Sequence, residues 1–185
     1  MKFDILYKFY YNNIIKLKED YFMVIEGRGI LLRPFTLNDV NEFYLIAHDK
    51  AVKEFVPYAY CATRRKAKEL VANYVTYDFK NDFYYAICNA TDGKMIGAIM
   101  AYRIPNSQCL DVSGFIGANY RRKGYMLAAT MLFIDAIAKN TKLECLRFTV
   151  SPYNQPSMSI MWTLGLPDNG DEMIYFYPLS WARKE

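Results

Sequence analysis

The stretch from Asp111 to Asn140 constrains the fold of this chain more than any other part of the sequence. It opens with an apolar, strand-like run, passes through the basic turn Arg121-Arg122-Lys123-Gly124, and continues as a long helical pattern from Tyr125. Apolar residues recur through that pattern at three- and four-residue spacing, which predicts an amphipathic helix over 125–140. The sequence therefore predicts a strand that leads into a helix through a basic, glycine-containing turn.

A turn of this kind can bind an anion. The first amide groups of a helix lack partners within the helix, and the helix dipole adds partial positive charge at that end. Gly124 would let the backbone approach a ligand closely, and Arg121, Arg122 and Lys123 would add charge around a phosphate or pyrophosphate. The other interpretation is an ordinary solvated loop. The two common phosphate-loop patterns, Gly-x-x-x-x-Gly-Lys-Ser/Thr and Gly-x-Gly-x-x-Gly, are absent.

Length and composition indicate one globular domain that binds neither nucleic acid nor membrane. The 185 residues are 53% hydrophobic, and the formal net charge of +4 is too small and scattered to indicate a nucleic-acid partner. No apolar run is long enough to cross a bilayer, and the N-terminus has no signal-peptide pattern, so we expect a cytoplasmic protein. The single histidine argues against a histidine-based metal site.

The four cysteines are far apart in the sequence and show no paired metal-binding spacing. We expect them to be free, buried thiols in a reducing compartment. They are Cys61, Cys88, Cys109 and Cys145.

Residues 1–22 form a separate N-terminal leader ahead of a single domain over 23–185. The leader is apolar on nearly all sides, with charged residues interspersed. This pattern suits a helix that docks on the domain or on a partner subunit. The partner could be a second copy of the chain, which would make the protein a homodimer. A helix lying on a membrane surface would have a cleaner polar face.

Periodicity, capping signals and turn residues predict a strand, three helices, an antiparallel meander, and then alternating helices and strands. Thr36 and Asp39 form a capping-box-like start, Pro57 ends the second helix, and Pro156 suits the first turn of a late helix. The predicted strands are 30–34, 83–89, 95–104, 109–117, 144–150 and 173–179. The predicted helices are 36–47, 49–56, 63–78, 125–140 and 155–164.

This order of elements resembles the GNAT superfamily of acyl-CoA-dependent N-acyltransferases, and three motifs over residues 24–179 carry the resemblance. The segment 30–39 resembles the Leu-Arg-Pro-x-Thr-x-x-Asp opening of the branch that includes ribosomal-protein N-terminal acetyltransferases. The segment 121–126 resembles the superfamily's Arg/Gln-x-x-Gly-x-Gly/Ala pyrophosphate loop. Segments 154–157 and 162–166 resemble the branch's Asn-x-x-Ser and Lys-x-Gly-Phe. The resemblance implies an α+β, three-layer GNAT fold, with a mixed central sheet flanked by helices.

The resemblance also implies acetyl-CoA as cosubstrate. Its pyrophosphate would lie on the amides of about Arg122 to Leu127, and its pantetheine arm would run along the strand end Phe115-Ile116-Gly117. An amide near Ile116 or Gly117 would polarise the thioester carbonyl. The implied cofactor-binding residues are Phe115, Ile116, Gly117, Arg121, Arg122, Lys123, Gly124, Tyr125, Met126, Asn154 and Ser157.

For the chemistry, the resemblance implies Ser157 as the acid or thiol-contacting group, because the tyrosine acid of many members is replaced here by Met161. Asp111 and His48 are the candidate bases. The alternative for Asp111 is that it is a strand-edge carboxylate in water. The alternative for His48 is that it is an ordinary solvated loop histidine. Met126 replaces the small last residue of the pyrophosphate loop, and could crowd the phosphates or point elsewhere.

The expected function is an acetyl-CoA-dependent N-acetyltransferase that acts on a primary amine, either a protein N-terminus or a small molecule, by direct transfer in a ternary complex. The alternative is a non-catalytic acyl-CoA-binding or protein-interaction module on the same fold. Several tyrosines could line an acceptor cleft or could simply pack, and Trp162 is expected in the core. These tyrosines are Tyr58, Tyr60, Tyr84, Tyr85 and Tyr102.

Overall fold

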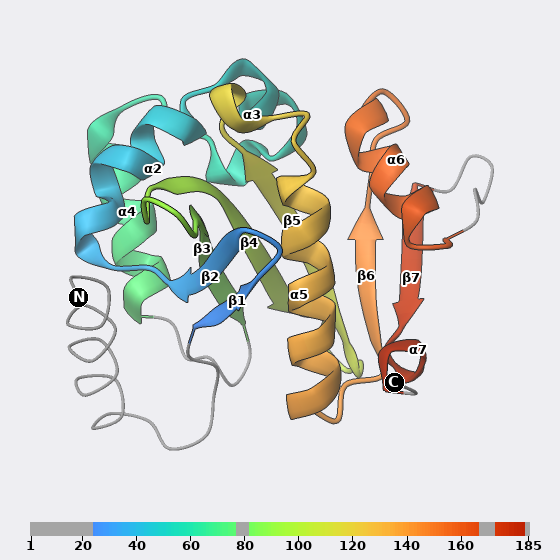
Figure 1. Cartoon of the computed structure of the whole chain (residues 1–185). Coiled ribbons are helices and arrows are strands. Elements are labelled where there is room, and N and C mark those ends of the chain that lie inside the picture. The colour runs from blue at the N-terminus through green and yellow to red at the C-terminus, as the bar shows by residue number, and fades with distance from the viewer. Residues whose placement is uncertain (1–23, 77–81, 167–172, 184–185) are drawn as a thin grey trace, which may run out of the picture.

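The computed structural model describes residues 24–76, 82–166 and 173–183 (Figure 1). The predicted leader 1–22 and the predicted turn 167–170 lie outside these residues. The chain is built around one seven-stranded sheet with the order β1-β2-β3-β4-β5-β6-β7. Its strands are β1 (Ile25–Gly27), β2 (Ile30–Pro34), β3 (Phe83–Asn89), β4 (Met95–Arg103), β5 (Cys109–Ile116), β6 (Cys145–Thr149) and β7 (Ile174–Pro178). The six predicted strands are confirmed, and β1 is an addition.

Among these strands, every neighbouring pair is antiparallel except β5 and β6, which run parallel. The chain reaches β6 from β5 through a long helix, as a parallel connection requires. The described helical segments are η1 (Leu37–Asp39), α2 (Val40–Ala47), α3 (Lys50–Phe55), η2 (Pro57–Ala59), α4 (Arg64–Thr76), η3 (Ala118–Tyr120), α5 (Tyr125–Asn140), α6 (Gln155–Thr163) and α7 (Leu179–Ala182).

The helices cover the sheet from both sides and make three layers. On one face, buried residues of α2, α3 and α4 pack with alternate residues of β3 and β4, such as Tyr84 and Met100. On the other face, α5, α6 and α7 pack with the intervening residues, such as Tyr85 and Ile99. In Figure 1, α5 runs across the sheet and α6 follows β6. The predicted α+β, three-layer fold with a mixed sheet is confirmed.

The turn between β2 and α2 is held by one buried carboxylate. Asp39, which is 3% exposed, accepts two hydrogen bonds from the Arg33 guanidinium, at 2.8 and 2.6 Å. The amide of Thr36 also donates to Asp39, at 2.7 Å. Opposite charge and satisfied hydrogen bonds make burial of this carboxylate tolerable. The predicted capping-box-like start is therefore reinforced by an ion pair that connects the end of β2 to the start of α2.

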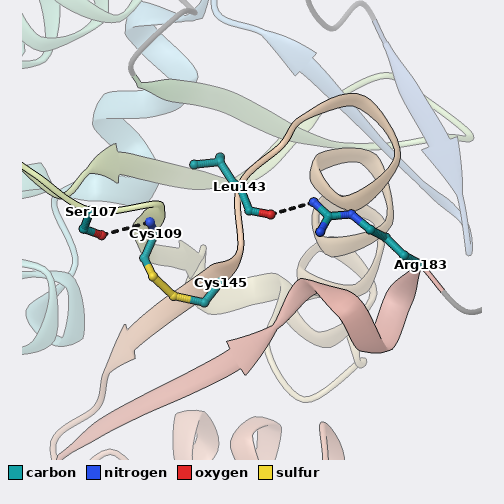
Figure 2. The surroundings of a disulfide bond; sticks show 5 residues. All are labelled: Ser107, Cys109, Leu143, Cys145 and Arg183. Atoms are coloured by element: carbon teal, nitrogen blue, oxygen red, sulfur yellow. Dashed lines mark hydrogen bonds between the residues drawn. A yellow bond between two sulfur atoms is a disulfide. The ribbon is translucent and has the colours of Figure 1, made fainter.

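The prediction of four free thiols is wrong for two cysteines. Cys109 and Cys145 are directly opposite each other in the β5–β6 pair and form a disulfide, with their Cα atoms 4.6 Å apart (Figure 2). Parallel registration of the two strands brings the cysteines together, although 36 residues separate them in sequence. Cys61 and Cys88 are free and buried, as predicted.

The side chain of Arg183 lies near the disulfide and binds the end of α5 and the turn that follows it (Figure 2). Its guanidinium donates to the carbonyl oxygens of Ala138, Thr141 and Leu143, at 3.0, 3.1 and 2.6 Å. The last carbonyls of a helix lack partners within the helix, so this side chain satisfies the end of α5 and the turn into β6.

One packing prediction is corrected. Trp162 is 50% exposed and not part of the core, because α6 turns Met158 and Met161 toward the sheet. Tyr84 and Tyr85 are buried packing residues. None of the helices in the described part of the chain has the length and apolar character needed to span a bilayer.

Candidate active site

The parallel strands β5 and β6 separate like the arms of a fork. They pair from Cys109 with Cys145 as far as Val112 with Phe148. Beyond that point β5 continues to Ile116 while β6 ends at Thr149. The side of β5 that faces β6 therefore has no partner strand there among the described residues. Unpaired backbone amides and carbonyls of this kind can bind an extended ligand as an additional strand would.

A cavity of about 480 Å³ lies at this fork. Its lining comes from five elements and their connections: the two separating strands, α5, α6 and the end of α3. This convergence of elements at a break in strand pairing is where a ligand site is expected in a mixed sheet. The lining residues are Glu54, Phe55, Val56, Val112, Ser113, Gly114, Met126, Thr130, Phe148, Thr149, Val150, Ser151, Tyr153, Asn154, Ser157, Ile160, Met161 and Met173.

The basic turn ahead of α5 has the conformation of an open anion site. Gly124 caps α5 in the left-handed conformation with φ of 77°, and Arg122 has φ of 61°. A Cβ added at Gly124 would meet nothing within 4 Å, so the space beside this backbone is open. Arg122, Lys123 and Gly124 are exposed, and the free amides of the first turn of α5 follow them.

Arg121 has protein partners instead of pointing into open space. Its Nε donates to the carbonyl oxygen of Ile116 at 2.9 Å, and its Nη2 donates to Asp49 at 2.5 Å. Burial alone would raise the pKa of Asp49, but the hydrogen bond and charge of Arg121, with the amide of Ala51, outweigh it and lower that pKa. The predicted pyrophosphate contact of Arg121 therefore competes with two bonds inside the protein.

The predicted pair Asn154 and Ser157 lies in the cavity wall. The Asn154 side chain accepts a hydrogen bond from the amide of Ser157 at 3.3 Å and so caps the start of α6. Both residues line the cavity, as does Met161, which is 3% exposed. The wall thus presents a serine hydroxyl at the cavity, with an apolar thioether where many superfamily members have a tyrosine.

Met126 does not crowd the basic turn. It lines the cavity and packs over Gly114 of β5, where an added Cβ would lie 2.6 Å from the Met126 Cε. The same Cβ would lie 2.7 Å from the carbonyl oxygen of Ala98. The missing side chain at Gly114 therefore makes room for the large side chain at Met126.

Asp111 lies on the other face of β5 and is engaged by Arg147 of β6. Arg147 Nη2 donates to Asp111 Oδ2 at 2.7 Å, which raises the pKa of Arg147. Two residues further along β5, the Tyr58 hydroxyl donates to Ser113. Burial of that hydroxyl raises the pKa of Tyr58, and Asp111 adds to the rise against the opposing bond to Ser113. Tyr58 is therefore protonated at neutral pH.

His48 is outside the cavity lining. It follows α2 and is exposed, and its Nδ1 donates to the carbonyl oxygen of Cys61 at 2.7 Å. Its ring packs with those of Tyr44 and Tyr60, with centroids 5.2 and 5.8 Å apart. The described residues contain no cluster of three or more histidine, cysteine, aspartate or glutamate side chains that could hold a metal ion.

The structure thus brings Met126, Asn154 and Ser157 together in the cavity lining and leaves Asp111 and His48 outside it. Ser113, Gly114 and Glu54 line the cavity and are not among the predicted site residues. Ser113 and Gly114 directly precede the predicted binding segment 115–117, so a segment that began two residues earlier would have included them. No sequence signal marks Glu54.

Comparison with known proteins identifies the family. Residues 30–167 match the family model described as the acetyltransferase (GNAT) domain. A Bacillus subtilis (strain 168) protein named "Uncharacterized N-acetyltransferase YnaD" is 25% identical over 148 residues, covering 80% of this chain and 85% of that protein.

Two solved structures share the fold. An acetyltransferase of the GNAT family from Bacillus anthracis has a TM-score of 0.72 and 19% identity, covering 84% of this chain and 97% of its own. The ribosomal-protein-S5-alanine acetyltransferase from Vibrio fischeri has a TM-score of 0.65 and 16% identity, covering 85% and 97%. The superfamily resemblance inferred from the motifs is confirmed, because the family model spans most of the chain: this protein belongs to the GNAT acetyltransferase family.

Proposed function

We propose that the protein is an acetyl-CoA-dependent N-acetyltransferase that transfers the acetyl group directly to a primary amine, either a protein N-terminus or a small molecule. The observation that carries the proposal is the fork between β5 and β6, with its cavity and its unpaired strand edge. Family membership supports acetyl transfer in general, and the fork is suited to a long, linear cosubstrate such as acetyl-CoA.

The cosubstrate would lie across two sites that the backbone provides. The pyrophosphate would accept hydrogen bonds from the amides at the start of α5, beside the open turn at Gly124. The pantetheine arm would continue along the unpaired edge of β5, next to Ser113 and Gly114. The Asn154 side chain is already used in capping α6, so we expect it to shape the wall around the arm and contact it through its amide nitrogen.

The transfer step needs a neutral amine, an acceptor for its proton, and stabilisation of the leaving thiolate. The amine nitrogen attacks the thioester carbonyl carbon, the carbon–sulfur bond breaks, and the thiolate takes a proton or a hydrogen bond. Ser157, which lines the cavity, would make that hydrogen bond. Asp111 would act as a base only after giving up Arg147, and His48 only through water or a movement of α2.

Two observations favour the alternative of a binding module without turnover. Met161 replaces the tyrosine acid, and the two candidate bases are engaged or distant. In this alternative, acetyl-CoA would bind at the same fork, and no amine would be acetylated.

The test is calorimetric binding of acetyl-CoA to the wild type and to Gly124→Glu. A carboxylate side chain at this position should exclude the pyrophosphate by size and charge, so we expect micromolar binding that the substitution abolishes. Gly93→Glu is the matched control, because Gly93 also has a left-handed backbone (φ of 71°) and nothing within 4 Å of an added Cβ, but lies in the β3–β4 turn. A folded wild type that does not bind acetyl-CoA would overturn the proposal.

If acetyl-CoA binds, a panel of primary amines separates the two functions. Release of free CoA thiol in the presence of N-terminal peptides, polyamines or other small amines supports the enzyme. Binding with no turnover on any of them supports the module.

A further inference from the structure

The side chain of Arg121 joins two parts of the molecule that lie on either side of the cavity. Its Nε holds the carbonyl oxygen of Ile116, the last residue of β5, at 2.9 Å. Its Nη2 holds Asp49, 72 residues earlier in the sequence, at 2.5 Å. The guanidinium is thus bound to the strand end beside the fork and paired with a carboxylate of opposite charge.

Asp49 is the anchor of a short helix. The oxygen that receives Arg121 also accepts a hydrogen bond from the amide of Ala51 at 2.9 Å, so it caps α3. The ion pair is partly exposed, with 36% of the Arg121 side chain and 23% of the Asp49 side chain accessible. The lowered pKa of Asp49 is consistent with a carboxylate that remains charged for this purpose.

The helix that Asp49 caps forms one wall of the cavity. Glu54 and Phe55 of α3 and the following Val56 line it. Glu54 is the one aspartate or glutamate among the described residues of the lining. Just beyond, Tyr58 donates to Ser113 of β5. The segment 49–58 is therefore attached to β5 or its following turn at both ends, and the cavity wall lies between the attachments.

We propose that Arg121 is a positioning residue, which acts through Asp49 to hold the α3 wall, and with it Glu54, against the end of β5. This inference rests on the proposed function, since the wall matters only if the cavity holds acetyl-CoA and an amine. In this arrangement the pyrophosphate is held by backbone amides and the open turn, and Arg121 connects the cosubstrate loop to α3. A wall that carries the lining carboxylate must be held in place for an amine to meet the thioester.

The two roles of Arg121 make opposite predictions for the Asp49 partner. If Arg121 held the phosphates, Asp49→Asn would leave acetyl-CoA binding intact or strengthen it, because the arginine would be released from its carboxylate. If Arg121 positions the wall, Arg121→Gln and Asp49→Asn both remove the ion pair, and their effects have the same direction. Asparagine is as good an N-cap as aspartate, so Asp49→Asn removes the charge while keeping the cap of α3.

The experiment compares wild type, Arg121→Gln, Asp49→Asn and the double variant by three measurements. These are hydrogen exchange of the α3 amides, acetyl-CoA affinity by calorimetry, and kcat/KM for acetylation of a peptide with a free N-terminal alanine. We expect α3 amides to exchange faster in all three variants, at least about threefold, because the ion pair is lost in each. Acetyl-CoA Kd should change by less than about threefold, while kcat/KM for the peptide falls about tenfold in each variant.

Arg65→Gln is the matched control. Arg65 also pairs with a carboxylate, Glu69 at 3.9 Å, but on the exposed surface of α4. Its loss should change none of the three measurements.

Two results would overturn the inference. One is a loss of acetyl-CoA affinity of about tenfold or more in Arg121→Gln but not in Asp49→Asn, which would make Arg121 a phosphate ligand. The other is unchanged α3 exchange in both single variants. If the wild type binds no acetyl-CoA, the proposed function fails, while the exchange measurement still decides whether Arg121 holds α3.

Discussion

Breaking the disulfide between Cys109 and Cys145 should lower the stability of the protein without changing its fold. The bond connects β5 and β6 at the closed end of the fork. Other contacts at that end survive reduction, because Arg183 still holds the carbonyl of Leu143 and Arg147 still holds Asp111. We therefore expect reduced protein to be folded but less resistant to heat and denaturant.

The size of the effect follows from the loop that the bond closes. Cys109 and Cys145 are separated by 36 residues. In the chain-entropy model, a cross-link over a loop of this length restricts the unfolded chain enough to stabilise the folded state by about 3.8 kcal/mol at 25 °C. For a domain of this size, one kcal/mol shifts Tm by about 2–4 °C, so reduction should lower Tm by about 8–15 °C.

The assay is thermal and urea unfolding with and without a reductant. The Cys109→Ser/Cys145→Ser variant should unfold like the reduced wild type, and its stability should not change when reductant is added. The Cys61→Ala/Cys88→Ala variant should keep the full reductant effect, because these cysteines are free. Alkylation of the unreduced, denatured wild type should label two thiols. Labelling of all four cysteines, or a reductant effect below about 1 kcal/mol, would refute the reasoning.

Three further changes test other contacts. Asp39→Ala leaves the Arg33 guanidinium without its buried carboxylate and should cost about 3–5 kcal/mol in urea unfolding; a loss below about 1 kcal/mol would mean that water replaces the carboxylate. Gly114→Ala places a methyl group 2.7 Å from the Ala98 carbonyl oxygen and should cost about 1–3 kcal/mol, again by urea unfolding, unless the strand pair shifts. Asp49 has a lowered pKa in the folded state, so its stabilising charge is present above its usual pKa and is lost as pH falls through the lower folded value. The stability difference between wild type and Asp49→Asn should therefore shrink as pH falls from 6 toward 3, and a constant difference would contradict the link.

The elements with strong local signals could be predicted from the sequence. The helix α5 has the predicted bounds Tyr125–Asn140, because its apolar spacing is regular and Gly124 marks its start. The strand β2 also has its predicted bounds, ending at Pro34. By contrast, β1 has three residues, Ile25–Gly27, which is too short to show alternation.

Contacts between distant residues could not be predicted in the same way. The disulfide and the Asp111–Arg147 pair both depend on the register of β5 against β6, which no local pattern encodes. The basic turn suggested a phosphate ligand at Arg121, but its partner Asp49 is 72 residues away. The cavity residues that were predicted, Met126, Asn154 and Ser157, came from two motifs, each with spacing local to the start of one helix.

The contacts of Arg183 also set an order for assembly during synthesis. The antiparallel strands β2 to β5 can pair in the order in which they leave the ribosome, each with its predecessor. The carbonyls of Ala138, Thr141 and Leu143 cannot accept hydrogen bonds from the Arg183 guanidinium until residue 183 has been synthesised. Until β6 (Cys145–Thr149) is made, the growing chain carries an unpaired β5 edge, which a chaperone or a neighbouring nascent chain could contact.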